Sequence, residues 1–263
     1  MVNIYKAGIT GASKDIHRAR LDVKKILAIV DLLRIVRSKL HKDPGYEKIF
    51  KKLYRASGRI REIQVTLLLL TKPEFASYDL TLFKDALLKQ EKDSTFDFLK
   101  VIRKFDELKL SRLENKIKKE VSRITPATLH KKTKKYIQSK TSMSMELLEK
   151  GDGDENLHRV RQHIKELSTV LNLIFTFKPS DHLEMVINGL NRSEMMVGDW
   201  HDRVILADSL LSFLKHSTDI SESQMTHLKD CHQFIMLANN QQVESIVLDV
   251  RKAIIESMPA KGS

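Results

Sequence analysis

The stretch N-L-H-R-V-R-Q-H-I-K occupies residues 156–165, and a similar stretch, D-I-H-R-A-R-L-D-V-K, occupies residues 15–24. Both match the pattern H-R-x-R-x-x-x-K, and their first histidines, His17 and His158, are 141 residues apart. Each copy opens a long segment whose apolar residues recur at helical spacing. Two matched copies at one offset indicate two equivalent halves of the molecule.

Each copy places its basic residues on one face of the helix that it begins. Positions 0, 3 and 7 of an α-helix share a face, and seven residues span about 10 Å. A single basic run would be read as a solvated helix face, and it is the repetition in the same order that favours binding of an anion. The first ridge consists of His17, Arg20 and Lys24, and the second consists of His158, Arg161 and Lys165.

A second pair of matched segments supports the duplication. Residues 58–65 read G-R-I-R-E-I-Q-V, and residues 198–205 read G-D-W-H-D-R-V-I. Both have a glycine, two intervening residues, a basic or imidazole group, a carboxylate, and an apolar residue three positions further on. The matched positions are Gly58, Arg61 and Glu62 in the first copy and Gly198, His201 and Asp202 in the second.

Composition favours an all-α fold with a sizeable core. The 263 residues are 41% hydrophobic and contain only nine Gly and five Pro, most of which lie at expected helix boundaries. We expect helices over about 13–41, 46–71, 79–123, 126–150, 154–178, 181–217 and 221–257, after a loose leader at 1–12. We expect residues 93–95 to kink the long third segment, and Thr125 to cap the helix that follows it. No long linker separates the halves, so we expect them to pack as one compact unit.

The net charge and the cysteine content indicate which class of partner and which cellular compartment to expect. Lys and Arg total 46 against 34 acidic residues, which gives a net charge of +12 and predicts an anionic partner. Cys231 is the single cysteine, so no intrachain disulfide framework exists and a reducing compartment is favoured. The N-terminal residues lack the apolar core of a signal peptide, and the richest apolar run, residues 65–70, is too short to span a bilayer. We therefore expect a cytoplasmic protein without a membrane partner.

Other candidate sites are weak. His227 and Cys231 lie one helical turn apart, but nothing near them in sequence completes a tetrahedral metal site. No Ser/His/Asp arrangement and no clustered acidic metal site is evident, so we expect neither a cofactor nor catalysis. Aromatic residues are only 6% of the chain and do not alternate with the basic residues, which argues against a stacking platform for single-stranded nucleic acid.

The four motifs in this order resemble the CHAD family, the conserved-histidine α-helical domain. The resemblance rests on His17-x-x-Arg20-x-x-x-Lys24-Lys25, on its second copy, and on the G-x-x-[RH]-[DE] pair, and it covers about residues 13–257. It implies one domain of two helical bundles, about 13–125 and 126–257, related by a pseudo-twofold axis with a basic groove between them. It also implies non-catalytic binding of inorganic polyphosphate and, in many members, location on polyphosphate granules.

The resemblance and the charge pattern together define the expected binding residues. The ridges contribute six of them, the neighbouring position and the second motif contribute three, and the lysine-rich helix after Pro126 contributes two. These are His17, Arg20, Lys24, Lys25, Arg61, His158, Arg161, Lys165, His201, Lys131 and Lys135. The helix after Pro126 is read equally well as a solvated face.

Three positions depart from the family pattern, which usually has Arg or Lys eight and ten residues after the histidine. Leu27 occupies the tenth position of the first copy, and Glu166 and Ser168 occupy the eighth and tenth positions of the second. The two departures in the second copy leave the second ridge with fewer basic residues than the family pattern has. A nucleic-acid-binding helical protein is the alternative reading, because a phosphodiester backbone would be held by the same charges.

Overall fold

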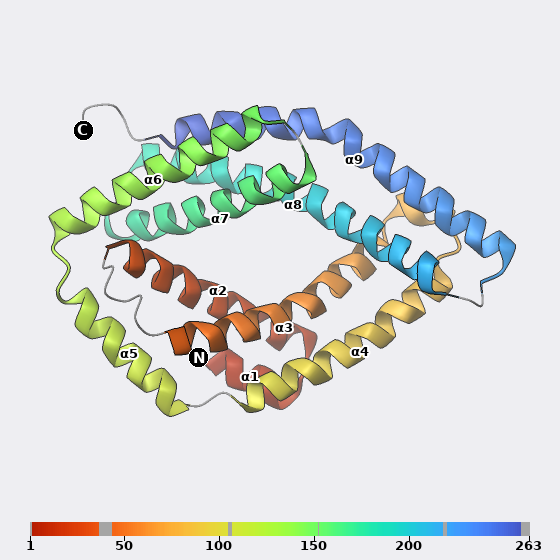
Figure 1. The fold of residues 1–263 in the computed structure, drawn as a ribbon, viewed down its shortest axis with the longest axis horizontal. Helices are drawn as coiled ribbons and strands as arrows, with labels where there is room; N and C mark the ends of the chain where they lie inside the picture. The colour runs from red at the N-terminus through yellow and green to blue at the C-terminus, as the bar shows by residue number, and fades with distance from the viewer. Residues whose placement is uncertain (1, 37–43, 105–106, 152, 218–219, 259–263) are drawn as a thin grey trace. The chain divides into compact units, whose positions relative to one another are not determined.

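The structure is a computed structural model that describes residues 2–36, 44–104, 107–151, 153–217 and 220–258 (Figure 1). These residues form nine α-helices and a short 3-10 helix, η2, with no strand among them, which confirms the all-α prediction. The helices are α1 Val2–Thr10, α2 Ser13–Val36, α3 Pro44–Leu69, α4 Thr81–Arg103, α5 Glu107–Val121, α6 Pro126–Glu149, α7 Asp154–Phe177, α8 Asp181–His216 and α9 Glu222–Glu256, with η2 at Pro73–Phe75.

The expectation of one long helix over residues 79–123 was wrong. That segment is two helices, and the break follows Arg103. Residues 93–95, where a kink was predicted, lie inside α4, and Oγ1 of Thr95 donates there to the carbonyl oxygen of Glu91 at 2.8 Å, a contact that often bends helices. The cap at Thr125 is confirmed, since its Oγ1 accepts from the backbone N–H of Thr128. The predicted end of the first helix near residue 41 lies outside the described residues.

The N-terminal segment is also helical, which corrects the expectation of a loose leader at residues 1–12. Ile4 and Ala7, three residues apart, are fully buried on one face of α1. A Cβ atom at Gly8 would lie 2.5 Å from Cγ2 of Ile102, so glycine allows α1 to approach α4 closely. The pattern of small and apolar residues was therefore sufficient for a packed helix, although it is only nine residues long.

The chain divides into two compact units that are not contiguous in sequence. Unit 1 contains the described residues of 1–29, 41–119 and 202–238, and unit 2 contains those of 30–40, 120–201 and 239–263. The long helices α8 and α9 therefore contribute one part to each unit. The internal repeat and the packing of the two repeats as one domain stay predictions.

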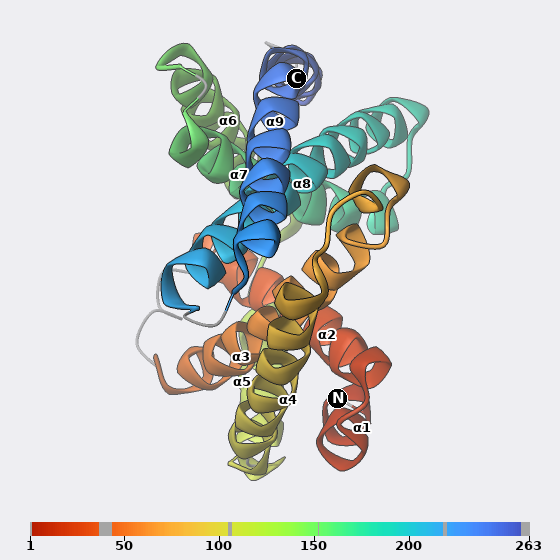
Figure 2. The same ribbon diagram turned by 90° about the vertical axis from the view of Figure 1, so that its right-hand side faces the viewer.

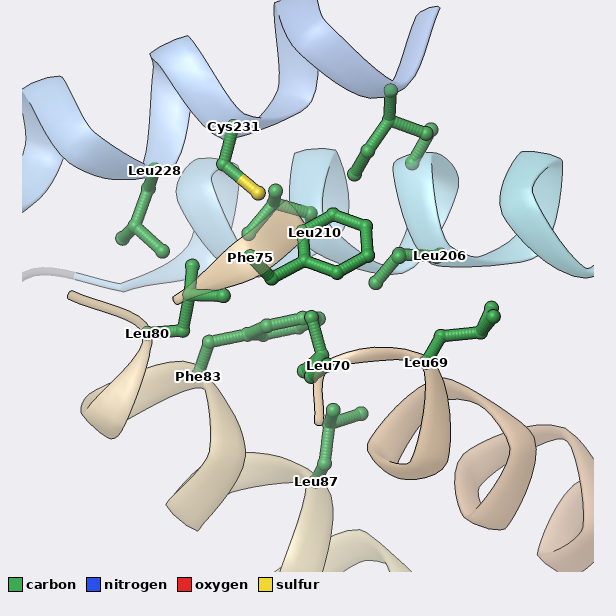
Figure 3. Packing of buried hydrophobic residues seen from close by; sticks show 12 residues of the cluster. Leu69, Leu70, Phe75, Leu80, Phe83, Leu87, Leu206, Leu210, Leu228 and Cys231 are labelled. Atoms are coloured by element: carbon green, nitrogen blue, oxygen red, sulfur yellow. The ribbon is translucent and has the colours of Figure 1, made fainter. Parts of the chain in front are cut away.

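Unit 1 has two hydrophobic clusters, of which the second gathers five elements. Its side chains come from the end of α3, η2, α4, the later part of α8 and the first part of α9. Figure 3 shows Phe83, Leu210 and Cys231 pointing toward one another from α4, α8 and α9. The other cluster packs α1, α2, α3 and α4 together, with Phe50 and Phe98 at most 2% exposed.

Unit 2 is built around α7, which lies side by side with α6 in both views (Figure 1, Figure 2). Tyr136 and Lys140 of α6 reach Glu166 of α7 at 2.8 and 2.7 Å, which ties the two helices together. Ser144 is fully buried, and its Oγ lies 2.8 Å from the carbonyl oxygen of Lys140 and 3.0 Å from Nδ1 of His163. These buried polar groups are therefore paired within the helix pair, as burial requires.

Candidate functional site

Both ridges lie at the edge of a buried helix stripe. Each ridge residue directly follows a residue of the hydrophobic core, so it is turned about 100° from that residue around the helix axis. The core residues are Ile16, Ala19 and Val23 in α2 and Leu157, Val160 and Ile164 in α7, none more than 3% exposed. All six ridge residues are accordingly half-buried, so each side chain is partly accessible to a ligand.

Four basic residues of unit 1, here called the first cluster, come from α2 and α3: His17, Arg20, Lys24 and Arg61. Burial lowers the pKa of His17, and the nearby positive charges of Arg61 and Arg20 lower it further. Nδ1 of His17 is shielded from solvent and has no hydrogen-bond partner among the described residues. The predicted ridge and the predicted basic residue of the second motif are thus neighbours in space.

Arg20 is held against the backbone of α3. Its Nη1 donates to the carbonyl oxygen of Tyr54 at 2.6 Å and lies 3.5 Å from Oγ of Ser57. Its Cζ stands 4.0 Å from the centre of the Tyr54 ring, within the range of a cation–π contact. Arg20 therefore has one preferred orientation in the free protein.

The two carboxylates of the second motif also come close together within unit 1. Partial desolvation raises the pKa of Glu62, and the negative charge of Asp202 acts in the same direction, against the lowering effect of Arg20 and Arg59. These acidic groups lie beside the first cluster and offset part of its positive charge.

Four residues of unit 2, here called the second cluster, come from α7 and α8: His158, Arg161, Lys165 and His201. The rings of His158 and His201 lie 4.9 Å apart between centroids. Nε2 of Gln162 lies 2.8 Å from Nε2 of His158, and an amide nitrogen can only donate, so this contact fits a neutral His158 ring. In both units, the ridge histidine therefore lies near the residue three positions after the motif glycine: the charge of Arg61 lowers the pKa of His17, and the ring of His201 lies beside that of His158.

The second cluster combines two cations, Arg161 and Lys165, with two imidazoles whose pKa values are lowered. Burial lowers the pKa of His201 to about 4, with further lowering by Arg161, His158 and Lys165. Burial also lowers the pKa of His158, again together with Arg161 and Lys165. Both imidazoles are therefore neutral at pH 7 and would take up protons if a polyanion brought negative charge beside them.

The remaining predicted residues lie elsewhere. Lys25 is exposed, one position beyond Lys24 and so about 100° away from the ridge around α2. Lys131 and Lys135 are exposed on α6, two residues before the buried Thr133 and Ile137, which places them on the opposite side of α6 from its buried stripe. The structure thus brings neither α6 lysine into the second cluster.

The departures from the family pattern have structural explanations. Ser168 is 6% exposed and donates to Oδ1 of Asn191 on α8 at 2.8 Å, so the tenth position faces the interior. Leu27, at the same position of the first copy, packs against the hydrophobic cluster of α1–α4. Glu166 is used to tie α6 to α7 through Tyr136 and Lys140.

Tyr54, Ser57 and Gln162 contact ridge residues but were not among the residues predicted from the sequence. Tyr54, Gly58 and Arg61 follow one another at spacings of four and three, so they share a face of α3. That spacing could have identified Tyr54 as a neighbour of the first cluster. Gln162 follows His158 by four residues and was recognisable in the same way.

The described part of the chain contains neither a group of metal ligands nor a helix that could span a membrane. In it, no group of three or more His, Cys, Asp or Glu side chains is placed to hold a metal ion. His227 and Cys231 accordingly do not form part of such a group, and burial raises the pKa of the Cys231 thiol to about 11. None of the described helices combines the length and the apolar character needed to cross a membrane.

Comparison with solved structures identifies the fold. The crystal structure of the CHAD domain from the plant Ricinus communis superposes with a TM-score of 0.70 over 96% of this chain and 85% of that chain, at 15% sequence identity. The chain has a CHAD-like fold. No model of a known protein family matches the sequence, and no curated protein matches it. At this level of identity the likeness establishes the CHAD-like architecture, which agrees with the resemblance expected from the four motifs.

Proposed function

We propose that this protein binds inorganic polyphosphate, without catalysing a reaction, through the first and second clusters. The observation that carries the proposal is the same pairing in both units. A ridge of His, Arg and Lys on one helix meets a further basic or imidazole residue on the next helix, Arg61 in unit 1 and His201 in unit 2. The CHAD-like fold supports the proposal by providing the helical frame expected from the motifs.

The side chains in the clusters suit a ligand that is a string of phosphates. An arginine guanidinium can donate two parallel hydrogen bonds to phosphate oxygens, and a lysine ammonium supplies a mobile point charge. A neutral imidazole can donate one N–H, and becomes a cation when a polyanion raises its pKa. No base-reading group is needed, because polyphosphate carries none.

Nucleic acid is less well suited to these clusters. The single tryptophan of the sequence, Trp200, is 1% exposed and cannot stack on a base. Exposed lysines such as Lys131 and Lys135 would add sequence-independent attraction to any phosphate backbone. We therefore expect nucleic acid to bind more weakly than polyphosphate of equal charge, with a strong dependence on salt.

A competition titration tests the proposal. Fluorescently labelled polyphosphate is titrated with the protein, and unlabelled polyphosphate, ATP, single-stranded DNA and duplex DNA are used as competitors at equal phosphate concentration. Polyphosphate should displace the label at the lowest concentration. Equal displacement by DNA would instead support the nucleic-acid alternative, and release of phosphate from polyphosphate or ATP would contradict the non-catalytic part. In cells that form polyphosphate granules, we expect the tagged protein to locate there.

A pair of double variants tests whether the ridges themselves bind. Lys24→Ala with Lys165→Ala removes one ridge charge from each unit, whereas Arg18→Ala with Arg159→Ala removes the same charge from exposed positions beside the ridges. Each lost phosphate contact should cost about 1–3 kcal/mol, so the ridge variant should bind at least tenfold more weakly. Circular dichroism establishes that both variants are folded. Equal losses would show that only net charge matters.

A further inference from the structure

The guanidinium of Arg20 packs against a short stretch of α3. Nη1 of Arg20 reaches the carbonyl oxygen of Tyr54, and Cζ lies over the Tyr54 ring at 4.0 Å. Oγ of Ser57, which lies 3.5 Å from Nη1, itself donates to the same Tyr54 carbonyl at 3.0 Å. The guanidinium thus rests across one turn of α3, between Tyr54 and Gly58.

Gly58 leaves the space that this arrangement needs. A Cβ atom at Gly58 would lie 3.1 Å from Nη1 and 3.7 Å from both Cζ and Nη2 of Arg20. That approach is tighter than ordinary packing, so an alanine there would push the guanidinium by a few tenths of an ångström. Glycine within a helix is less stable than alanine, and Gly58 is not among the glycines with positive φ, so its backbone conformation does not require glycine.

The matched glycine of the other copy is in a different situation. A Cβ atom at Gly198 would meet nothing within 4 Å among the described residues. The need for a small residue is therefore specific to the α2–α3 pair, although the sequence pattern is the same.

We propose that Tyr54 and Gly58 are positioning residues, which hold the Arg20 guanidinium in a fixed orientation to receive a phosphate group in the first cluster. This inference rests on the proposed function and assigns a role to two residues outside the basic ridges. The two contacts with backbone and hydroxyl oxygen use Nη1, and a guanidinium has five N–H donors, so Arg20 can be anchored and still donate to a ligand. Anchoring removes the rotamer freedom that a long side chain would otherwise lose on binding.

A double-mutant cycle on polyphosphate affinity tests this role. Gly58→Ala should weaken binding about three- to tenfold in the natural sequence, which corresponds to disturbing but not deleting one charge-assisted contact. In an Arg20→Ala background, Gly58→Ala should produce no further loss, because it acts through Arg20. The matched control, Gly198→Ala, should leave affinity unchanged and raise the melting temperature, since alanine favours helix.

Substitutions of Tyr54 provide a second test of the positioning role if the Gly58→Ala variant does not fold. Tyr54→Phe keeps both the ring and the backbone carbonyl and should retain the natural affinity, whereas Tyr54→Leu loses the ring and should bind about threefold more weakly. Unchanged affinity in both Gly58→Ala and Tyr54→Leu, or an equal loss from Gly58→Ala with and without Arg20, would overturn the inference. Absence of polyphosphate binding by the unaltered protein would instead overturn the proposed function, so the two failures are distinguishable.

Discussion

In the α2–α3 pair, the residue that meets the ridge histidine is Arg61, whereas in the α7–α8 pair it is His201. The first pair also anchors its ridge arginine, because Arg20 is bound to the carbonyl oxygen of Tyr54. The second pair instead places two neutral imidazoles 4.9 Å apart. Two segments with one sequence pattern thus differ in the residue opposite the ridge histidine, which is a permanently charged arginine in one and an imidazole that must be protonated to carry charge in the other.

We therefore expect the positive charge of the two clusters to depend differently on pH. Arg20 and Arg61 stay charged at every physiological pH, so the charge that they contribute to the first cluster does not vary across the neutral range. Desolvation and the charges of Arg161 and Lys165 keep His158 and His201 neutral, so these two imidazoles add to the positive charge of the second cluster only when a ligand or a lower pH protonates them. A duplicated motif can therefore keep its spacing while its copies diverge in chemistry.

Of the changes considered, replacing Arg61 by His and His201 by Arg should alter the affinity for polyphosphate most. Arg61→His removes a permanent charge and should weaken polyphosphate binding at pH 7.5 by tenfold or more, at about 1–3 kcal/mol per charge-assisted contact. His201→Arg adds a permanent charge to the second cluster and should tighten binding at the same pH. Fluorescence anisotropy with labelled polyphosphate measures both constants.

The exchange has an internal control in its pH dependence. Affinity of the Arg61→His variant should vary more with pH than that of the natural protein, and affinity of the His201→Arg variant should vary less. If the two variants gave parallel pH profiles, the clusters would not differ as the pKa values indicate.

Binding by the unaltered protein should tighten as the pH falls. A polyphosphate chain raises the pKa of His158 and His201 above their low values in the free protein, so binding takes up protons and is favoured at lower pH. We expect the affinity to increase between pH 7.5 and 5.5. Because the pKa of His201 is about 4 in the free protein, an increase of about tenfold over this range requires the bound polyanion to raise that pKa to about 6.5. Titrations at constant ionic strength over this range provide the measurement, and His201→Asn should flatten the profile.

The free energy of unfolding of the ligand-free protein should decrease as the pH falls, whereas its affinity for polyphosphate should increase. The pKa of His201 is about 4 in the folded protein and that of His158 is also lowered, whereas both have their ordinary value when unfolded. Between about pH 6.5 and 4 the unfolded chain therefore binds more protons, so the free energy of unfolding falls as the pH falls through that window. Urea unfolding at pH 7.5, 6.0 and 5.0 without ligand measures this, and a stability that rose toward pH 5 would contradict neutral, buried imidazoles.

The eighth position after each histidine should show the smallest effect. Glu166→Lys removes the contacts of Glu166 with Tyr136 and Lys140 and should lower the free energy of unfolding by about 1 kcal/mol. Lys25→Ala, at the matched and exposed position of the first copy, should change it by less than about 0.5 kcal/mol. Chemical denaturation of both variants measures this difference, and equal changes would show that Glu166 is not a specific tie between α6 and α7.

The sequence by itself determined most of the helices, although it missed α1 and the break between α4 and α5. Apolar spacing such as Ile16, Ala19 and Val23 specifies a helix stripe, because every third or fourth residue returns to the same side. The repeated motifs indicated a CHAD-like architecture, which the structural comparison confirms. These properties follow from short-range spacing along one helix.

Only the tertiary structure decided what each ridge faces. Helical spacing gives the direction of a side chain but not the identity of the helix that packs opposite, so it could not reveal that Arg20 rests on Tyr54 or that His158 meets His201. For the same reason, the lysine-rich sequence of α6 did not reveal that Lys131 and Lys135 lie on the opposite side of that helix from its buried stripe. The pKa of His201 likewise depends on desolvation and on charges from a different helix, which are consequences of packing between elements distant in sequence.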